Sequence, residues 1–290
     1  MTEQAMTFGP GGAMIGILTR PTTPRKNAPV VLLTNAGVIP RQGPHRINVK
    51  LARALALQGI ASLRFDLSGN GDSGSIGNTE GICAQAVNDL QSAMDAVNNA
   101  MGTSRFLIVG ICSGAVHAYN VALADERVSG ILMFDGFWYR SRYTTPIRDV
   151  KRALDADWAS RIAAIKRRFV PTNVAEEPTA ESQAANSMAA NNPYSSPPIE
   201  DYKAAMRKLF NRGTDVFVLF GGSVIDYYSY AGQFKDVFAG EPFYADVRCE
   251  FHPDIDHTFI SRHAQQKLLA LACDWASAQE KKSMALNQRV

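Results

Sequence analysis

A cysteine in a glycine-flanked turn is the residue of this sequence best placed to do chemistry. Residues 110–114 read Gly-Ile-Cys-Ser-Gly, between a short apolar run and a helix that is predicted to begin at Ser113. A strand that turns sharply into a helix presents the residue at its tip as a nucleophile, and the residues two before and two after it must be small. Gly110 and Gly114 meet that requirement for Cys112, whereas an isoleucine would flank Ser113 in the same way. We therefore predict that Cys112 is the nucleophile, with a thiolate stabilised by the start of the helix.

A cysteine nucleophile needs an imidazole base and a carboxylate that orients it. His257 lies in the loop PDIDHTFIS between the last predicted strand and the closing helix, so it is the predicted base, with His252 as the runner-up. Asp226 follows the strand at 215–222 and is the predicted acid. Asp135, at the end of the preceding strand, is the alternative acid.

A tetrahedral oxyanion would be stabilised by two backbone N–H groups. One is predicted to come from Ser113, directly after the nucleophile, and the other from Gly37 or Val38 in the loop after an early strand. His45 and Arg46 lie at the exit of that same loop. They are candidates for contact with a substrate carboxylate or phosphate, and packing at the start of a helix explains them equally well.

Short apolar runs alternate with amphipathic segments along most of the chain. This pattern predicts an α/β fold, a doubly wound and mainly parallel sheet with helices on both faces. The predicted strands lie at 12–20 (one half of a hairpin), 29–35, 60–67, 105–111, 128–135, 215–222 and 244–251. The predicted helices lie at 46–58, at 80–101, from 113 onward and at 261–279.

The alternation stops between residues 137 and 213, where the chain becomes polar and helical. We interpret this segment as a helical cap inserted into a core made of residues 1–136 and 214–290. Trp138 and Arg140 stand at the entry of the cap and are candidate substrate-binding residues, although packing of the cap on the core also accounts for them.

Composition and charge exclude several classes of protein. The net charge of +3 gives no reason to expect binding to nucleic acid, and no apolar run is long enough to span a membrane. The N-terminus lacks the pattern of a signal peptide, which favours a cytoplasmic location. The four cysteines have no metal-ligand spacing and no cofactor motif is present, so we expect neither metal nor cofactor. The sequence does not predict the oligomeric state.

Several of these segments together resemble a known superfamily. The run GPHRINVKLARALALQGIASLRFDLSGNGDSG, the cysteine elbow and the histidine in DHTF are similar to the α/β hydrolases. More narrowly, they resemble the exosortase A system-associated hydrolases, through the G-x-H-R segment, the RFD-x-x-G-x-GDS turn and the cysteine. The resemblance covers about residues 30–135 and 215–275. It implies an α/β-hydrolase fold and a hydrolase or acyltransferase role linked to a cell-surface polymer or to secondary metabolism.

Three functions remain open from the sequence. The first is hydrolysis of a small-molecule ester or thioester, either free or bound to a carrier protein or coenzyme A, by Cys112, His257 and Asp226. The second is acyl transfer from Cys112 to an amine, an alcohol or a carrier-protein thiol, since thioesters react more readily with amines and thiols than with water. The third is a non-catalytic binding module. It is the least favoured, because the nucleophile, the acid and the histidine occur in the chain order of an active enzyme. Hydrolysis is the primary prediction.

Overall fold

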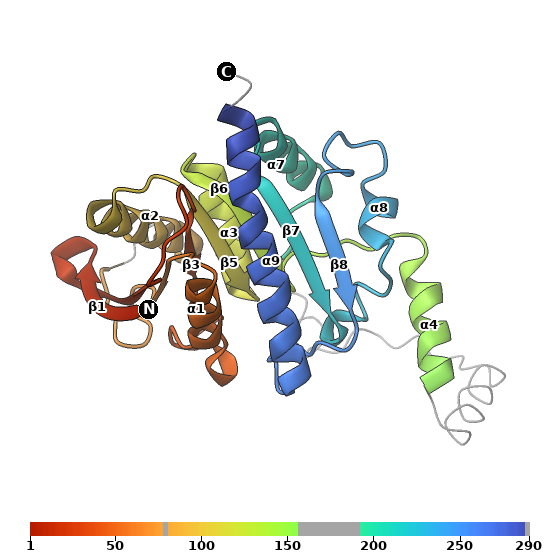
Figure 1. Cartoon of the computed structure of the whole chain (residues 1–290). Coiled ribbons are helices and arrows are strands. Elements are labelled where there is room, and N and C mark those ends of the chain that lie inside the picture. The colour runs from red at the N-terminus through yellow and green to blue at the C-terminus, as the bar shows by residue number, and fades with distance from the viewer. Residues whose placement is uncertain (78–80, 156–191, 288–290) are drawn as a thin grey trace.

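The computed structural model describes residues 1–77, 81–155 and 192–287. Figure 1 shows a twisted sheet covered by helices on both faces. The strands are β1 (Thr2–Phe8), β2 (Met14–Arg20), β3 (Val30–Leu33), β4 (Ser62–Phe65), β5 (Phe106–Ile111), β6 (Val128–Phe134), β7 (Asp215–Gly221) and β8 (Arg248–His252). The helices are α1 (Ile47–Leu57), α2 (Ile82–Met101), α3 (Ser113–Ala124), α4 (Thr144–Asp155), α7 (Ile199–Asn211), α8 (Gln233–Val237) and α9 (Arg262–Asn287).

The eight strands form one sheet in the order β1-β2-β4-β3-β5-β6-β7-β8. β1 pairs antiparallel with β2, and β2 with β4, while every other neighbouring pair is parallel. This confirms the predicted mainly parallel α/β fold. It also supplies the other half of the hairpin at 12–20, which is β1, a strand whose mostly exposed residues give little hydrophobic signal.

The central strands are buried on both faces, which explains their continuous apolar sequences. Along β5, alternate residues enter two different hydrophobic clusters: Phe106 and Ile108 face one, and Leu107 and Val109 face the other. The first cluster contains residues from α2, α3 and α7, and the second contains residues from α1 and α9. The parallel strands β3, β5, β6 and β7 therefore all end at one edge of the sheet, and the elbow lies there.

Part of the predicted cap packs as a core helix. Tyr202, Met206 and Leu209 of α7 are buried in the same cluster as α3. The residues from 156 to 191, which make up much of the predicted cap, lie outside the described part of the chain. The division into core and cap therefore stays a prediction, with α7 placed on the core side.

Candidate active site

Cys112 occupies the tip of a strained turn between β5 and α3. Its backbone has φ 58° and ψ −121°, a combination that costs free energy for a residue with a side chain and is typical of a nucleophile elbow. A Cβ on Gly110 would stand 2.0 Å from the carbonyl oxygen of Gly114, and a Cβ on Gly114 would stand 2.3 Å from Oγ1 of Thr34. Both flanking positions thus require glycine, as the sequence indicates for a turn centred on Cys112.

His257 lies beside Cys112 and is oriented by Asp135. Nδ1 of His257 is 2.7 Å from Oδ2 of Asp135, and the same histidine forms a hydrogen bond with the Cys112 thiol. The Asp135 side chain is fully buried, and its second oxygen, Oδ1, accepts a hydrogen bond of 2.7 Å from the Gly221 backbone. The backbone N–H of His257 donates to Oγ of Ser223 at 3.0 Å, so both the loop and the ring are held in place.

The prediction that Asp226 pairs with His257 is wrong. Asp226 is 44% exposed and forms an ion pair with Arg152 of α4. After β7 the chain makes a single turn of 3-10 helix, Gly222–Val224, which carries Asp226 outward. Asp135, at the end of the adjacent strand β6, has a positive φ of 48° and makes the contact with His257 instead. The runner-up base, His252, is bonded to Glu250 at 2.7 Å.

The charges of this group favour a thiolate and an imidazolium. The hydrogen bond from His257 lowers the pKa of Cys112 below the usual range of a thiol, against the opposing effect of burial. The backbone N–H of Ser113 also donates to this sulfur and stabilises its anionic form. The hydrogen bond to Asp135, followed by the one to Cys112, raises the pKa of His257 to about 10.

The other three cysteines are predicted to be far less reactive than Cys112. Burial raises the pKa of Cys83, raises that of Cys249 to about 12 and raises that of Cys273 to about 11. Since the thiolate is the species that reacts, iodoacetamide is expected to alkylate Cys112 first at neutral pH. The measurement is the rate of mass gain on each cysteine-containing peptide as a function of pH.

The pH dependence supplies the control for that prediction. A lowered pKa keeps Cys112 as a thiolate at pH values where an ordinary thiol is protonated, so its alkylation persists toward acid pH. His257→Ala removes the stabilising hydrogen bond and is expected to move the inflection of the alkylation profile to higher pH. Faster alkylation of Cys83, Cys249 or Cys273 would contradict the assignment.

The loop that carries the predicted oxyanion donors is bound to the elbow. The backbone N–H of Gly37 donates to Oγ of Ser113 at 2.7 Å. Val38, the next residue, is 84% exposed, so its side chain adds no packing that holds the loop. The loop is therefore positioned by hydrogen bonds at its two ends, one at Ser113 and the other in a buried network around Asp66.

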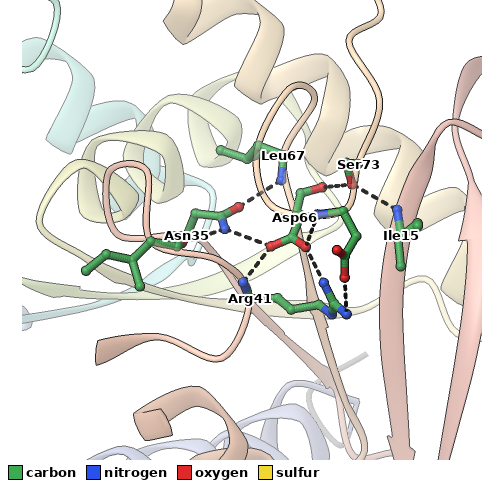
Figure 2. A network of polar contacts seen from close by, with 8 residues as sticks. Ile15, Asn35, Arg41, Asp66, Leu67 and Ser73 are labelled. Carbon is green, nitrogen blue, oxygen red and sulfur yellow. Dashed lines mark hydrogen bonds and ion pairs between the residues drawn. The ribbon is translucent and has the colours of Figure 1, made fainter. Parts of the chain in front are cut away.

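Figure 2 shows that network, in which Asp66 connects the oxyanion loop to the turn after β4. Oδ1 of Asp66 accepts hydrogen bonds from the Asn35 amide at 3.2 Å and from the Arg41 backbone at 2.5 Å. The Arg41 guanidinium forms an ion pair with Asp66 and reaches Asp72 at 2.7 Å. Oδ1 of Asn35 accepts from the Leu67 backbone at 2.8 Å. Both flanks of the loop at 36–40 are thus tied to a fully buried carboxylate.

The roles of Asn35, Arg41 and Asp66 are not among those predicted from the sequence. A signal was present, because Asn35 and Asp66 are polar residues that directly follow buried apolar strands. A polar residue in that position, where the carboxyl ends of parallel strands meet, is a candidate for a structural hydrogen bond or for a site. The pairing between the two could not be derived from that signal.

Four further predicted residues have their described contacts with other parts of the chain. His45 and Arg46 are exposed, and the charge of Arg46 acts on Glu3 and not on the elbow. Trp138 stacks on Tyr227 with a centroid distance of 3.9 Å, and Arg140 lies 5.2 Å from the same ring. Contact of any of these four with substrate stays a prediction.

Comparison with known proteins places the chain in a family. A family model described as serine aminopeptidase, S33, matches residues 46–217, which is more than half of the chain. The chain belongs to this family of α/β hydrolases. The protein is therefore an enzyme of the α/β-hydrolase type. Members of the S33 family are named for serine, whereas this member carries Cys112 at its elbow.

Solved structures show the same fold at low sequence identity. Proline iminopeptidase from Mycobacterium smegmatis is 15% identical, with a TM-score of 0.57 over 97% of this chain and 100% of that chain. Est1E from Butyrivibrio proteoclasticus is 13% identical, with a TM-score of 0.55 over 97% and 99%. Epoxide hydrolase VrEH1 from Vigna radiata is 15% identical, with a TM-score of 0.52 over 96% and 98%. No curated protein matches the sequence.

Within residues 1–77, 81–155 and 192–287, no group of three or more histidine, cysteine or acidic side chains is arranged to hold a metal ion. Within the same ranges, no helix is both long enough and apolar enough to cross a bilayer.

Proposed function

We propose that this protein hydrolyses a small-molecule ester or thioester through an acyl-thioester on Cys112. The observation that carries the proposal is the chain of contacts from Cys112 to His257 to Asp135, which is the arrangement of a nucleophile, a base and an orienting acid. The thiolate attacks the carbonyl carbon, and the oxyanion is stabilised by the N–H groups of Ser113 and Val38, because the Gly37 N–H already donates to Oγ of Ser113.

Collapse of the tetrahedral intermediate forms the acyl-thioester and expels the alcohol or thiol. The leaving group takes the proton of the His257 imidazolium, which thereby becomes a neutral base. In hydrolysis, His257 then removes a proton from water, the hydroxide attacks the thioester carbonyl and the carboxylic acid leaves with regeneration of the thiolate. Asp135 stays ionised throughout and stabilises the imidazolium.

A thioester is the substrate that best suits a cysteine at this position. Exchange of one thioester for another is nearly balanced in free energy, whereas attack by a thiolate on an oxygen ester must expel a more basic leaving group. This supports a carrier-protein or coenzyme A thioester as substrate, with Arg140 and Trp138 as candidate contacts for its leaving group.

Acyl transfer from Cys112 is the alternative, and the cysteine itself favours it. The acyl-thioester reacts readily with amines and thiols, and transfer needs water to be excluded from the open side of the acyl group. The G-x-H-R segment and the cysteine elbow resemble those of the exosortase A system-associated hydrolases. This resemblance supports an enzymatic role linked to a cell-surface polymer or to secondary metabolism.

The reaction of the acyl-enzyme with water or with an added nucleophile distinguishes hydrolysis from acyl transfer. Incubation with a panel of acyl thioesters is expected to add one acyl mass to the chain, on the peptide that contains Cys112. We expect the adduct to decay in buffer alone, at a rate that added millimolar amine or thiol leaves unchanged. A stable adduct that only an added nucleophile discharges would replace hydrolysis by transfer, and a chain that never gains acyl mass would overturn both.

A further inference from the structure

A largely apolar cavity of about 410 Å³ lies beside the elbow. It is lined by Gly37 and Val38 of the oxyanion loop, by His117 of α3 and by Asp89 of α2, and its volume lies within the range of about 300–1,000 Å³ that is common for ligand sites. The proposed mechanism assigns no role to this cavity.

The cavity lies close to the elbow, although Cys112 itself is not among the described residues that line it. The Gly37 backbone that lines it donates to Oγ of Ser113, the residue after Cys112. Ser113 and His117 are four residues apart on α3, so they lie on the same face of the helix. Tyr194 lines the cavity as well, and burial together with the nearby charges of Cys83 and Cys112 raises its pKa. These contacts place the cavity beside the residue that follows Cys112, on the side of the oxyanion loop.

His117 is a buried polar side chain with an unpaired ring nitrogen among the described residues. It is only 2% exposed, and its Nδ1 has no hydrogen-bond partner among the residues that the structure describes. Burial lowers its pKa to about 4, so the ring is neutral and offers one donor and one acceptor. Its contact with Tyr194 is edge to face, with centroids 5.6 Å apart. An unpaired buried polar group destabilises a protein unless a ligand or water completes it.

The charge of the cavity restricts what can enter it. Asp89 is buried, and its carboxylate accepts hydrogen bonds from Ser68 and Gln85 of the protein itself. Among the described residues that line the cavity there is no lysine or arginine. A second carboxylate would therefore be placed near Asp89 without a counter-ion, at a large cost in desolvation and repulsion.

Resting on the proposed function, we infer that this cavity holds the acyl group of the substrate and selects an uncharged acyl chain that carries a hydrogen-bonding group, such as a hydroxyl, for His117. The apolar wall binds the carbon chain. The hydroxyl pairs with the neutral imidazole, which otherwise stays unsatisfied. An acyl chain of equal length without the hydroxyl leaves that imidazole unpaired, and one that ends in a carboxylate meets Asp89.

The test compares three kinds of acyl thioester of N-acetylcysteamine, all of equal chain length. The first carries an alkanoyl group, the second is a hydroxyalkanoyl series that varies the hydroxyl position, and the third carries an ω-carboxyalkanoyl group. The rate constant for acyl loading on Cys112 is measured by intact mass. We expect the best hydroxyalkanoyl probe to load about tenfold faster than the alkanoyl probe, the effect of one satisfied hydrogen bond. The ω-carboxyalkanoyl probe is expected to load more slowly than both.

His117→Phe removes both ring nitrogens while it keeps an aromatic ring against Tyr194. In this variant the hydroxyalkanoyl-to-alkanoyl ratio is expected to fall to about one, because phenylalanine can neither donate nor accept a hydrogen bond. His263→Phe is the matched control, since His263 is an exposed residue of α9 bonded to Asp254. It should keep the wild-type ratio. The alkylation rate of Cys112 and the thermal unfolding curve confirm that both variants are folded.

The outcomes separate this inference from the proposed function. If the wild type loads alkanoyl and hydroxyalkanoyl probes equally, or if the preference persists in His117→Phe, the role of His117 is overturned while acyl loading itself still stands. If no probe loads onto Cys112 in the wild type, both the proposed function and the inference fall.

Discussion

Replacing Cys112 by alanine is expected to lower turnover of an acyl thioester by a factor on the order of 10⁶, to the level left by binding alone. The reason is that no other thiol or hydroxyl can take its place in the strained turn, where φ is 58°. Ser113 is directed elsewhere, because its hydroxyl accepts the hydrogen bond from Gly37. The measurement is steady-state turnover together with intact mass, which should show no acyl adduct.

Cys273→Ala provides the control for that result. Cys273 is buried in the cluster formed with α1 and α9, and its pKa is raised by burial, so it is expected to contribute packing and no chemistry. The variant should load acyl groups at the wild-type rate even if its unfolding temperature falls. Acyl adduct on a Cys112→Ala chain would show that the nucleophile is another residue.

Asp135→Asn is expected to lower kcat/KM by a factor on the order of 10⁴, the size of effect that follows loss of the orienting carboxylate in comparable triads. Asparagine keeps the shape of the side chain, but its neutral amide cannot stabilise the imidazolium of His257. The raised pKa of His257 depends first on the hydrogen bond to Asp135. The substitution should therefore also lower that pKa and move the alkylation profile of Cys112 toward higher pH, because the thiolate loses its cationic partner.

Asp226→Asn is the matched control for Asp135→Asn, because Asp226 follows the neighbouring strand β7. Asp226 is 44% exposed, and its ion pair with Arg152 is at the surface, where such pairs contribute about 0–1 kcal/mol. The kcat/KM of the Asp226→Asn enzyme is expected to stay within about twofold of wild type. Neither Asp226 nor Arg152 contacts His257 among the described hydrogen bonds. A large loss with Asp226→Asn and a small one with Asp135→Asn would return the acid to the end of β7.

Much of the fold follows from local physical requirements that the sequence expresses directly. Strands β3, β5 and β7 are nearly continuous apolar runs because both faces are buried, so their positions are predictable within a few residues. β1 is harder to predict from the sequence because it lies at the edge of the sheet and is mostly exposed. Its place depends on the pairing with β2, which is a contact between segments and not a property of either one.

The sequence by itself also predicts the candidate nucleophile and the candidate histidine. Gly110 and Gly114 are required by short-range steric contacts around Cys112, and His257 is identified by its place between the last strand and the closing helix. These features depend on residues close together in the chain, so one sequence is enough to predict them.

Only the tertiary structure decided between Asp135 and Asp226, and only it placed Asp66 and His117. Both acids follow neighbouring parallel strands whose carboxyl ends meet at the same edge, so the sequence pattern is nearly the same for each. The choice depends on turn conformation, since a positive φ at Asp135 directs its carboxylate to a histidine 122 residues later. Side-chain direction across such separations is set by the packing of several segments at once, and that packing exists only after the chain has folded.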